Sequence, residues 1–363
     1  MDRRGGRARI AYRDLDVEQL GAVYERVLEY EPAASGPVSL TRTREVRKSS
    51  GTFYTPRAVT AFLVRRTLEP LVNGRDADSI MRLRVLDPAM GSGAFLVAAC
   101  RYLASAAEQA LVREGRWHAH DVTSADRATL RREIASRCLF GVDLNPMAVQ
   151  LARLSLWLAT LAADKPLSFL DHHLVAGHSL VGATPDVVHR QPGGGRSTSR
   201  GHRRPLPLFD DTGLPSALEH AARVLTTVSA EPDDSSALVR ANERNMFELR
   251  ARESSLGQWT EVLDAWCASW FWNNGTPPDR GTFLDLMNRV LGRPCALPRH
   301  VAERLLDQSR DVASRLRFVH WPLAFPDVFL DAHASNRRAG FDAVIGNPPW
   351  DMIRGDSGEG DAR

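Results

Sequence analysis

The stretch LRVLDPAMGSGAFLVAAC, residues 83–100, contains the transition that decides the fold. The apolar run at 83–86 predicts a short strand, a loop with two glycines follows, and the alanine-rich segment 94–112 predicts a long helix. The pattern returns downstream as a strand at 139–142, ended by Asp143, and a helix over 147–162. Strands that alternate with helices predict an α/β fold with a parallel, doubly wound sheet.

Two more strands are predicted further along the chain, at 173–176 and 341–345. The roughly 160 residues between them far exceed the length of a helical crossover, so we expect an inserted subdomain. It begins with a basic stretch, 189–204, whose composition is typical of a mobile loop, and its remainder has a mainly helical pattern. An aromatic cluster is expected in its core: Trp266, Trp270, Phe271 and Trp272.

The sequence before the glycine loop predicts two helices. Residues 14–30 place apolar side chains at three- and four-residue steps, which indicates an amphipathic helix that needs a partner surface. A basic stretch follows at 42–48. The second helix is predicted to start with Pro56 in its first turn and Thr55 as its cap.

Composition excludes several classes of protein. A chain of 363 residues with 43% hydrophobic residues can bury a core, and its net charge of +3 is too small to indicate nucleic-acid binding by itself. No apolar run approaches the roughly 18 residues of a membrane span and no secretory signal is evident, so we expect a cytoplasmic protein without a membrane partner. Four dispersed cysteines lack a CxxC pair, which indicates buried thiols rather than a metal site: Cys100, Cys138, Cys267 and Cys295.

The glycine loop and the acid after the second strand indicate a nucleoside-binding site. Gly91 and Gly93 let backbone amides approach a ligand closely, and the absence of GxGxxG or GK[ST] argues against a dinucleotide or a polyphosphate. Asp143 is placed to accept hydrogen bonds from ribose hydroxyls. The alternative is that Asp143 caps the helix that opens at Asn145-Pro146.

The fourth strand ends in Asn347-Pro348-Pro349-Trp350. Ligands of parallel sheets bind at the carboxyl ends of the strands, so Asp87, Asp143 and Asn347 should converge there. An asparagine carbonyl and a neighbouring backbone carbonyl can accept hydrogen bonds from an exocyclic amino group, which makes its nitrogen a better nucleophile. Trp350 offers a face on which an extruded base can stack. The alternative is a proline-rich turn with a core tryptophan.

Taken together, these elements resemble the adenine-specific DNA methyltransferases, and most of all the large Eco57I-like restriction-modification and phage-defence methylases. Phe53-Tyr54-Thr55-Pro56 is similar to the first cofactor element of the family. Residues 87–95 resemble its S-adenosylmethionine loop, and 141–146 its ribose-binding region. The tetrapeptide 347–350 resembles the catalytic element. The resemblance implies these cofactor-binding residues: Tyr54, Thr55, Pro56, Asp87, Ala89, Gly91, Gly93 and Asp143. It implies these catalytic residues: Asn347, Pro348, Pro349 and Trp350.

Two features depart from the family pattern. His178 stands in Gly177-His178-Ser179-Leu180 where the family usually has Asp or Asn, which implies that an imidazole contacts the cofactor's adenine. The sequence also ends 13 residues after Trp350, whereas the family continues with three more strands, a second base-pocket element and a target-recognition domain. The resemblance therefore implies a Rossmann-like methyltransferase sheet that is C-terminally incomplete.

The resemblance also divides the chain into four parts. These are an N-terminal helical segment with a basic linker (1–50), the S-adenosylmethionine-binding part (51–182), the insertion (183–317) and the truncated catalytic part (318–363). The implied reaction is methylation of the N6 amino group of adenine in double-stranded DNA, with S-adenosylmethionine as cofactor and no metal. The implied partners are a restriction nuclease and a downstream chain that carries the missing strands.

Three alternatives stay open at this point. The exocyclic amine of cytosine poses the same chemical problem, although a serine more often replaces Asn347 in enzymes that act on it. The chain could instead be a noncatalytic subunit that binds DNA or a partner, or part of a fused restriction enzyme, although no nuclease motif is evident. We expect the chain alone to be inactive, or active only with a partner, and its fourth strand to be an exposed edge. The basic stretches 42–48 and 189–204 are candidates for phosphate contacts or simply solvated loops.

Overall fold

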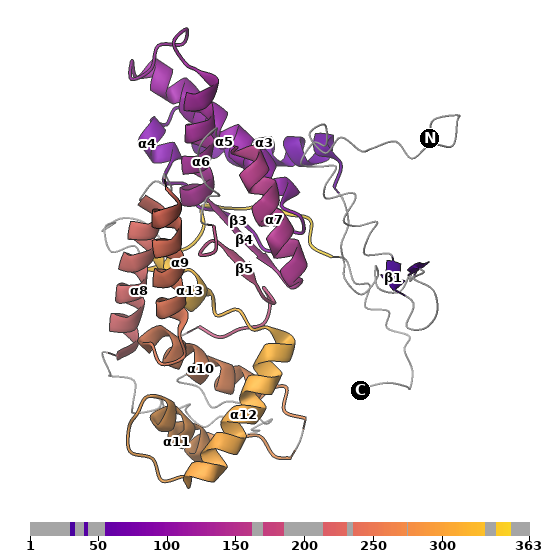
Figure 1. Cartoon of the computed structure of the whole chain (residues 1–363), viewed down its shortest axis with the longest axis vertical. Helices are drawn as coiled ribbons and strands as arrows, with labels where there is room; N and C mark the ends of the chain where they lie inside the picture. The colour runs from indigo at the N-terminus through magenta and orange to yellow at the C-terminus, as the bar shows by residue number, and fades with distance from the viewer. Residues whose placement is uncertain are drawn as a thin grey trace, which may run out of the picture.

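The structure is a computed structural model, and it describes residues 30–32, 40–42, 55–161, 170–184, 213–230, 235–273, 275–330 and 339–349 (Figure 1). Its centre is a sheet of four parallel strands in the order β5-β4-β3-β6. The strands are β3 (Val85–Asp87), β4 (Leu139–Asp143), β5 (Leu174–Ala176) and β6 (Ala343–Val344). All four predicted strands are thus confirmed, with ends that differ by one or two residues.

The strand β6 lies beside β3 although more than 250 residues separate them in the sequence. Its ladder continues beyond the two paired residues, because the Asp342 and Ile345 amides donate to the carbonyls of Arg84 and Leu86 at 2.8 Å each. Within the described residues β6 is an edge strand, as predicted, and Val344 is 59% exposed there. Pairing of this edge with another chain stays a prediction.

The structure confirms the helices predicted at 94–112 and 147–162 to within three residues, and it adds a short helix at 77–80 that was not predicted. Together with the helix after Pro56 and one at 124–138, they flank the sheet. They are α3 (Arg57–Val72), α4 (Ala77–Ile80), α5 (Ala94–Arg113), α6 (Ser124–Cys138) and α7 (Pro146–Ala159). The predicted start of α3 is wrong by one residue, because Pro56 is the N-cap rather than part of the first turn. The Thr55 side chain does not cap the helix; instead, the Thr55 carbonyl accepts from the Thr60 hydroxyl at 3.5 Å.

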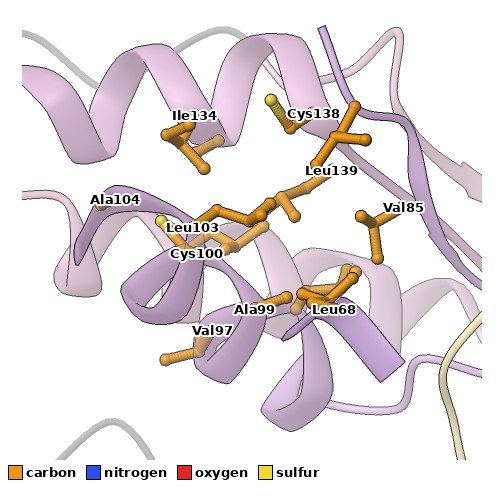
Figure 2. Packing of buried hydrophobic residues seen from close by; sticks show 14 of the residues in the cluster. Leu68, Val85, Val97, Ala99, Cys100, Leu103, Ala104, Ile134, Cys138 and Leu139 are labelled. Carbon is orange, nitrogen blue, oxygen red and sulfur yellow. The ribbon is translucent and has the colours of Figure 1, made fainter. Parts of the chain in front are cut away.

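The strands point alternate side chains into two apolar clusters on opposite faces of the sheet. Val85 and Leu139 face the larger cluster, which contains residues of α3, α5, α6 and α7 (Figure 2). Leu86 and Phe140 face a smaller cluster completed by Val319, Phe325 and Val328. Phe325 lies between α13 (Trp321–Ala324) and α14 (Pro326–Phe329), and Val328 lies within α14. Helices therefore contact both faces of the sheet.

The helix α5 is the central core helix of this part of the chain. Among the helices that the structure describes, it alone has the length and hydropathy to suit a membrane span, which the sequence analysis did not anticipate. In this fold its Leu96, Cys100 and Leu103 are fully buried against the sheet and the neighbouring helices. Cys138 and Cys267 are also buried free thiols, as predicted, whereas Cys295 is half-buried.

A helical subdomain separates β5 from β6, as predicted. It consists of α8 (Gly213–Ala230), α9 (Ser236–Arg250), α10 (Ser255–Ala268), α11 (Arg280–Val290) and α12 (Arg299–Leu316). Its core is built around Trp259, Leu263 and Phe283. The helices α10, α11 and α12 form the lower part of Figure 1. The exact boundaries of 183 and 317 stay a prediction, and the basic stretch 189–204 lies outside the described residues.

The expectation that the whole aromatic cluster of the subdomain is buried is wrong. Trp266 packs against the core, but Trp270 is 52% and Phe271 38% exposed. The reason is that α10 ends at Ala268, so that these two residues follow the helix into a surface turn. Trp270 keeps contact with Trp266 through rings 6.0 Å apart.

At the N-terminus the structure describes a short antiparallel pair, β1 (Tyr30–Pro32) with β2 (Leu40–Arg42). Neither strand of this pair was predicted. Tyr30 was expected at the end of a helix and Arg42 in a linker, whereas both residues belong to strands. The rest of the predicted helix, 14–29, and of the basic stretch, 43–48, lies outside the described residues.

The middle of β4 gives a prediction about stability. A Cβ on Gly141 would lie 2.2 Å from the Met90 sulfur and about 3 Å from methyl groups of Leu96 and Leu174. We expect Gly141→Ala to lower the free energy of unfolding by about 1–3 kcal/mol, because overpacking forces core side chains from their positions. Urea denaturation measures this change.

Gly281→Ala is the matched control for Gly141→Ala. The added Cβ would meet only the Asp279 carboxylate at 3.7 Å, and the site lies within the helix α11. We expect no loss there, since alanine favours a helix over glycine by about 1 kcal/mol. Equal stability of the Gly141→Ala variant and the parent would contradict the packing described for β4.

Candidate active site at the carboxyl ends of the strands

The glycine loop joins β3 to α5 at the carboxyl end of the sheet. Gly91 and Gly93 both have positive φ, 54° and 85°, a region that side chains other than glycine rarely adopt. A Cβ on Gly93 would also lie 3.1 Å from the backbone of Ala152 in α7. The two glycines therefore permit both the tight turn and the close packing of α7 against the start of α5.

Asp143 ties this loop to the next strand. One carboxylate oxygen, Oδ2, accepts from the Gly91 amide at 2.8 Å, and the other, Oδ1, accepts from the Asn145 amide at 2.8 Å. The helix cap is Asn145, whose side chain accepts from the Met147 amide, so the alternative role of Asp143 as that cap is wrong. Burial raises the pKa of Asp143, and the two donated hydrogen bonds oppose that rise.

Asp87 is a fully buried acid at the end of β3. Its Oδ1 accepts from the Ala89 amide at 3.1 Å, whereas its Oδ2 is buried without a hydrogen-bond partner. The pKa of Asp87 is raised to about 7, mainly by burial and to a lesser extent by the nearby negative charge of Asp143. A carboxyl group in this state is poised to ionise when a positively charged group comes close.

The end of β6 lies directly against Asp87. Gly346 has φ 155°, and a Cβ there would lie 2.6 Å from Oδ1 of Asp87, so only glycine fits without a shift. The next residue, Asn347, is exposed and donates from Nδ2 to the Thr55 hydroxyl at 3.3 Å. The structure thus joins the first predicted cofactor element to the predicted catalytic tetrapeptide across 292 positions of sequence.

His178 follows β5 at the same carboxyl end of the sheet. Its amide donates to the Arg317 carbonyl at 2.7 Å, and its ring Nδ1 accepts from the Leu180 amide at 3.3 Å. The ring is half-buried, beside the strand that carries Asp143. His178 is therefore near the predicted ribose site.

Most of the predicted site residues are brought to one end of the sheet. Ala89 lies in the glycine loop, Pro56 precedes α3, and Pro348 and Pro349 are exposed after Asn347. Tyr54 and Trp350 lie outside the described residues. The roles assigned to these residues stay predictions, since geometry alone shows only that they lie near one another.

The sequence analysis missed one participant, Arg317. This residue ends α12, and its guanidinium donates to the Leu144 carbonyl at 2.6 Å, next to Asp143. No local pattern could have found this contact, because 173 positions separate the two residues. Only the return of the chain from the helical subdomain brings them together.

A cavity of about 270 Å³ lies between α3 and α5, beside this site. It is lined by Thr55 and Ala94, which border the first element and the glycine loop, and by Val64 and Ala98. Arg101 and Tyr102 of α5 also line it. Thr55 thus borders both this cavity and Asn347.

The buried Asp87 carboxyl gives a prediction about pH. An unfolded aspartate titrates near 3.8, whereas Asp87 in the folded protein titrates at about 7. Between these values the folded chain holds a proton that the unfolded chain has released, so stability falls as the pH rises through this window and levels off above it. The free energy of unfolding should fall by a few kcal/mol across this window, and Asp87→Asn should remove the fall.

Urea denaturation of the parent and the Asp87→Asn variant at about pH 4.5 and about pH 8 measures the effect. The variant should gain stability relative to the parent at the higher pH. Asp311→Asn, at an exposed position of α12, is the control variant. Parallel pH profiles for parent and Asp87→Asn would show that Asp87 is ionised in the folded protein.

Comparison with known proteins is informative for both halves of the chain. The family model described as Eco57I restriction-modification methylase matches residues 137–361, and the one described as N-6 DNA Methylase matches residues 16–181. Together these two matches span every element of the candidate site described above.

Two curated proteins are similar to parts of the chain. A Methanocaldococcus jannaschii protein named "Putative type II restriction enzyme and methyltransferase RM.MjaORFECS2P" is 25% identical over 217 residues, which cover 47% of this chain and 17% of that protein. A Streptomyces coelicolor protein named "Adenine-specific methyltransferase PglX" is 33% identical over 145 residues, 37% of this chain and 10% of that protein. The matched segments are thus a small part of each relative's length.

Proposed function

Because the chain belongs to the Eco57I restriction-modification methylase family, we propose that it carries the cofactor-binding and catalytic segments of a DNA methyltransferase. The proposed reaction adds a methyl group to the exocyclic N6 amino group of adenine. The observation that carries the proposal is the junction of Asn347 with Thr55 beside the buried Asp87, since it unites the predicted catalytic and cofactor elements. The proposed fold is the doubly wound methyltransferase sheet, supported by helices on both faces.

The residues at the carboxyl ends of the strands fit S-adenosylmethionine. Asp87 offers a buried oxygen without a partner, which suits a positively charged group of the cofactor, and Asp143 offers a carboxylate to its ribose hydroxyls. Gly91 and Gly93 leave the backbone of the loop open to close approach. We propose that Thr55, the loop 87–93, Asp143 and His178 hold this cofactor. When bound, it supplies a methyl group on a positively charged sulfur.

Asn347 acts on the target base in this proposal. Its Nδ2 is engaged by the Thr55 hydroxyl, so its carbonyl oxygen remains to accept a hydrogen bond from the adenine amino group. The two prolines after it fix the backbone, so that a neighbouring carbonyl can accept the second amino hydrogen. Both bonds draw positive charge onto the hydrogens and make the amino nitrogen a better nucleophile. This requires the base to leave the double helix and enter the site.

The wider context is proposed from the family. Double-stranded DNA is the substrate, and restriction-modification or phage defence is the setting in which such an activity is used. A restriction nuclease and a chain that carries further strands are the proposed partners. A noncatalytic subunit that binds cofactor or DNA without turnover is the competing outcome of the test below.

The test uses an intact methylase that contains this chain together with the proposed further strands, duplex DNA of mixed sequence and S-adenosylmethionine with a tritiated methyl group. Tritium should appear in the DNA, and nucleoside mass spectrometry should assign it to N6-methyladenine. Label in N4-methylcytosine would overturn the choice of base. Cofactor binding by calorimetry without label in DNA would instead favour the noncatalytic subunit.

A further inference from the structure

The chain returns from the helical subdomain through a tightly built junction. Residues 317–319 run alongside the loop that follows β5, with a parallel bridge between His178 and Phe318. The His178 amide donates to the Arg317 carbonyl at 2.7 Å, and the Val319 amide donates to the Val181 carbonyl at 2.9 Å. The loop after β5 is therefore held by the end of the subdomain.

Two glycines make this close approach possible. A Cβ on Gly177 would lie 2.3 Å from a methyl group of Val319, and a Cβ on Gly182 would lie 1.9 Å from the Val319 carbonyl oxygen. The indole of Trp321 adds a hydrogen bond to the Ser179 carbonyl at 3.1 Å. The position of the His178 loop thus depends on the segment that begins at Arg317.

Arg317 itself has an unusual backbone for its residue type. It is the only residue other than glycine with positive φ, 53°, in the part of the chain that the structure describes. It forms the C-cap of α12 in the left-handed conformation, where glycine is the usual residue. The backbone therefore does not explain an arginine at this position.

The side chain of Arg317 supplies the explanation. Its guanidinium donates to the Leu144 carbonyl at 2.6 Å, in the turn between Asp143 and Asn145. One residue thus contacts both sides of the predicted adenosine site, through its carbonyl on the His178 loop and through its side chain on the Asp143 turn.

We propose that Arg317 is a positioning residue, which fixes the Asp143 turn and the His178 loop relative to each other around the adenosine half of the cofactor. This inference rests on the proposed function, because it assumes that S-adenosylmethionine binds there. It further implies that the helical subdomain is coupled to cofactor affinity, since α12 ends at the residue that holds the turn.

The test separates positioning from stability with Arg317→Gly. Glycine keeps the left-handed backbone without strain but removes the guanidinium, so the variant should melt at or above the temperature of the parent. Its affinity for S-adenosylmethionine, measured by calorimetry, should nevertheless fall about tenfold, the scale of one charged hydrogen bond. Arg317→Lys keeps one donor and should recover part of the affinity.

Arg304→Ala is the matched control. Arg304 is an exposed arginine on the same helix, about 20 Å along its axis from Arg317, and its loss should change neither melting nor affinity. Arg317→Gly with the affinity of the parent would overturn the proposal. A loss of affinity that only follows a drop in melting temperature would overturn it as well.

Hydrogen exchange on the cofactor-free protein distinguishes failure of this inference from failure of the proposed function. Arg317→Gly should speed exchange of the Asn145 and Met147 amides, which donate to Asp143 and Asn145 in the turn. If the parent binds no S-adenosylmethionine, the proposed function fails, and the exchange result alone decides whether Arg317 fixes the turn. Unchanged exchange would overturn the positioning role.

Discussion

In an intact methylase that contains this chain, Asn347→Ala is expected to reduce methyl transfer to DNA by at least about a hundredfold, while the affinity for S-adenosylmethionine stays within about twofold of the parent. The reason is that Asn347 is proposed to hold the amino group of the target base. Its one described side-chain contact with a cofactor element is the exposed hydrogen bond to Thr55, which is worth little. Binding and chemistry should therefore separate in this variant.

Transfer of tritium to duplex DNA measures the chemistry, and calorimetry measures the binding. Asn245→Ala is the control, since Asn245 is an exposed residue of α9 in the helical subdomain. Full turnover in Asn347→Ala would contradict the catalytic assignment. Loss of both turnover and cofactor affinity would mean that Asn347 belongs to the cofactor site instead.

Asp143→Ala is expected to weaken S-adenosylmethionine binding by about ten- to a hundredfold. A charged hydrogen bond to the ligand contributes about 1.5–3 kcal/mol, and this carboxylate also holds the Gly91 and Asn145 amides. Its removal therefore affects both a direct contact and the shape of the glycine loop. Asp143→Asn, which keeps one acceptor oxygen, should lose less.

Calorimetry on protein shown to be folded by circular dichroism measures this prediction. Asp121→Ala is the matched control, because Asp121 is an exposed acid in the turn before α6. An Asp143→Ala variant that binds as tightly as the parent would show that the acid after β4 does not contact the cofactor.

The strands and flanking helices were predictable because their signals are local. The change from an apolar run to the glycine loop at 83–94 marks β3 and α5, and Asn145-Pro146 marks the start of α7. The surface position of Trp270 and Phe271 was not predictable, since a run of aromatic residues does not reveal where its helix ends. The cap of α3 failed by one residue for a similar reason, because Thr55 and Pro56 both suit a helix start.

The site was predictable in its parts but not in its contacts. Asp87, Asp143 and Asn347 were each predicted to follow a strand at its carboxyl end, and in the structure all three lie at that end of the sheet. The contact of Asn347 with Thr55 and that of Arg317 with Leu144 join residues 292 and 173 positions apart. Such contacts depend on how the whole chain is packed, and no periodicity or spacing encodes them.

The second face of the sheet has a consequence for the order in which the protein is made. Leu86, Phe140 and Val142 pack against Val319, Phe325 and Val328, which the ribosome adds only after the entire helical subdomain. Until then the apolar face of these strands lacks its partners, because the contacts that cover it join residues far apart in the sequence. The polypeptide is thus most open to misassociation and to chaperone capture during synthesis of residues 177–318, a window that closes once α13 and α14 emerge.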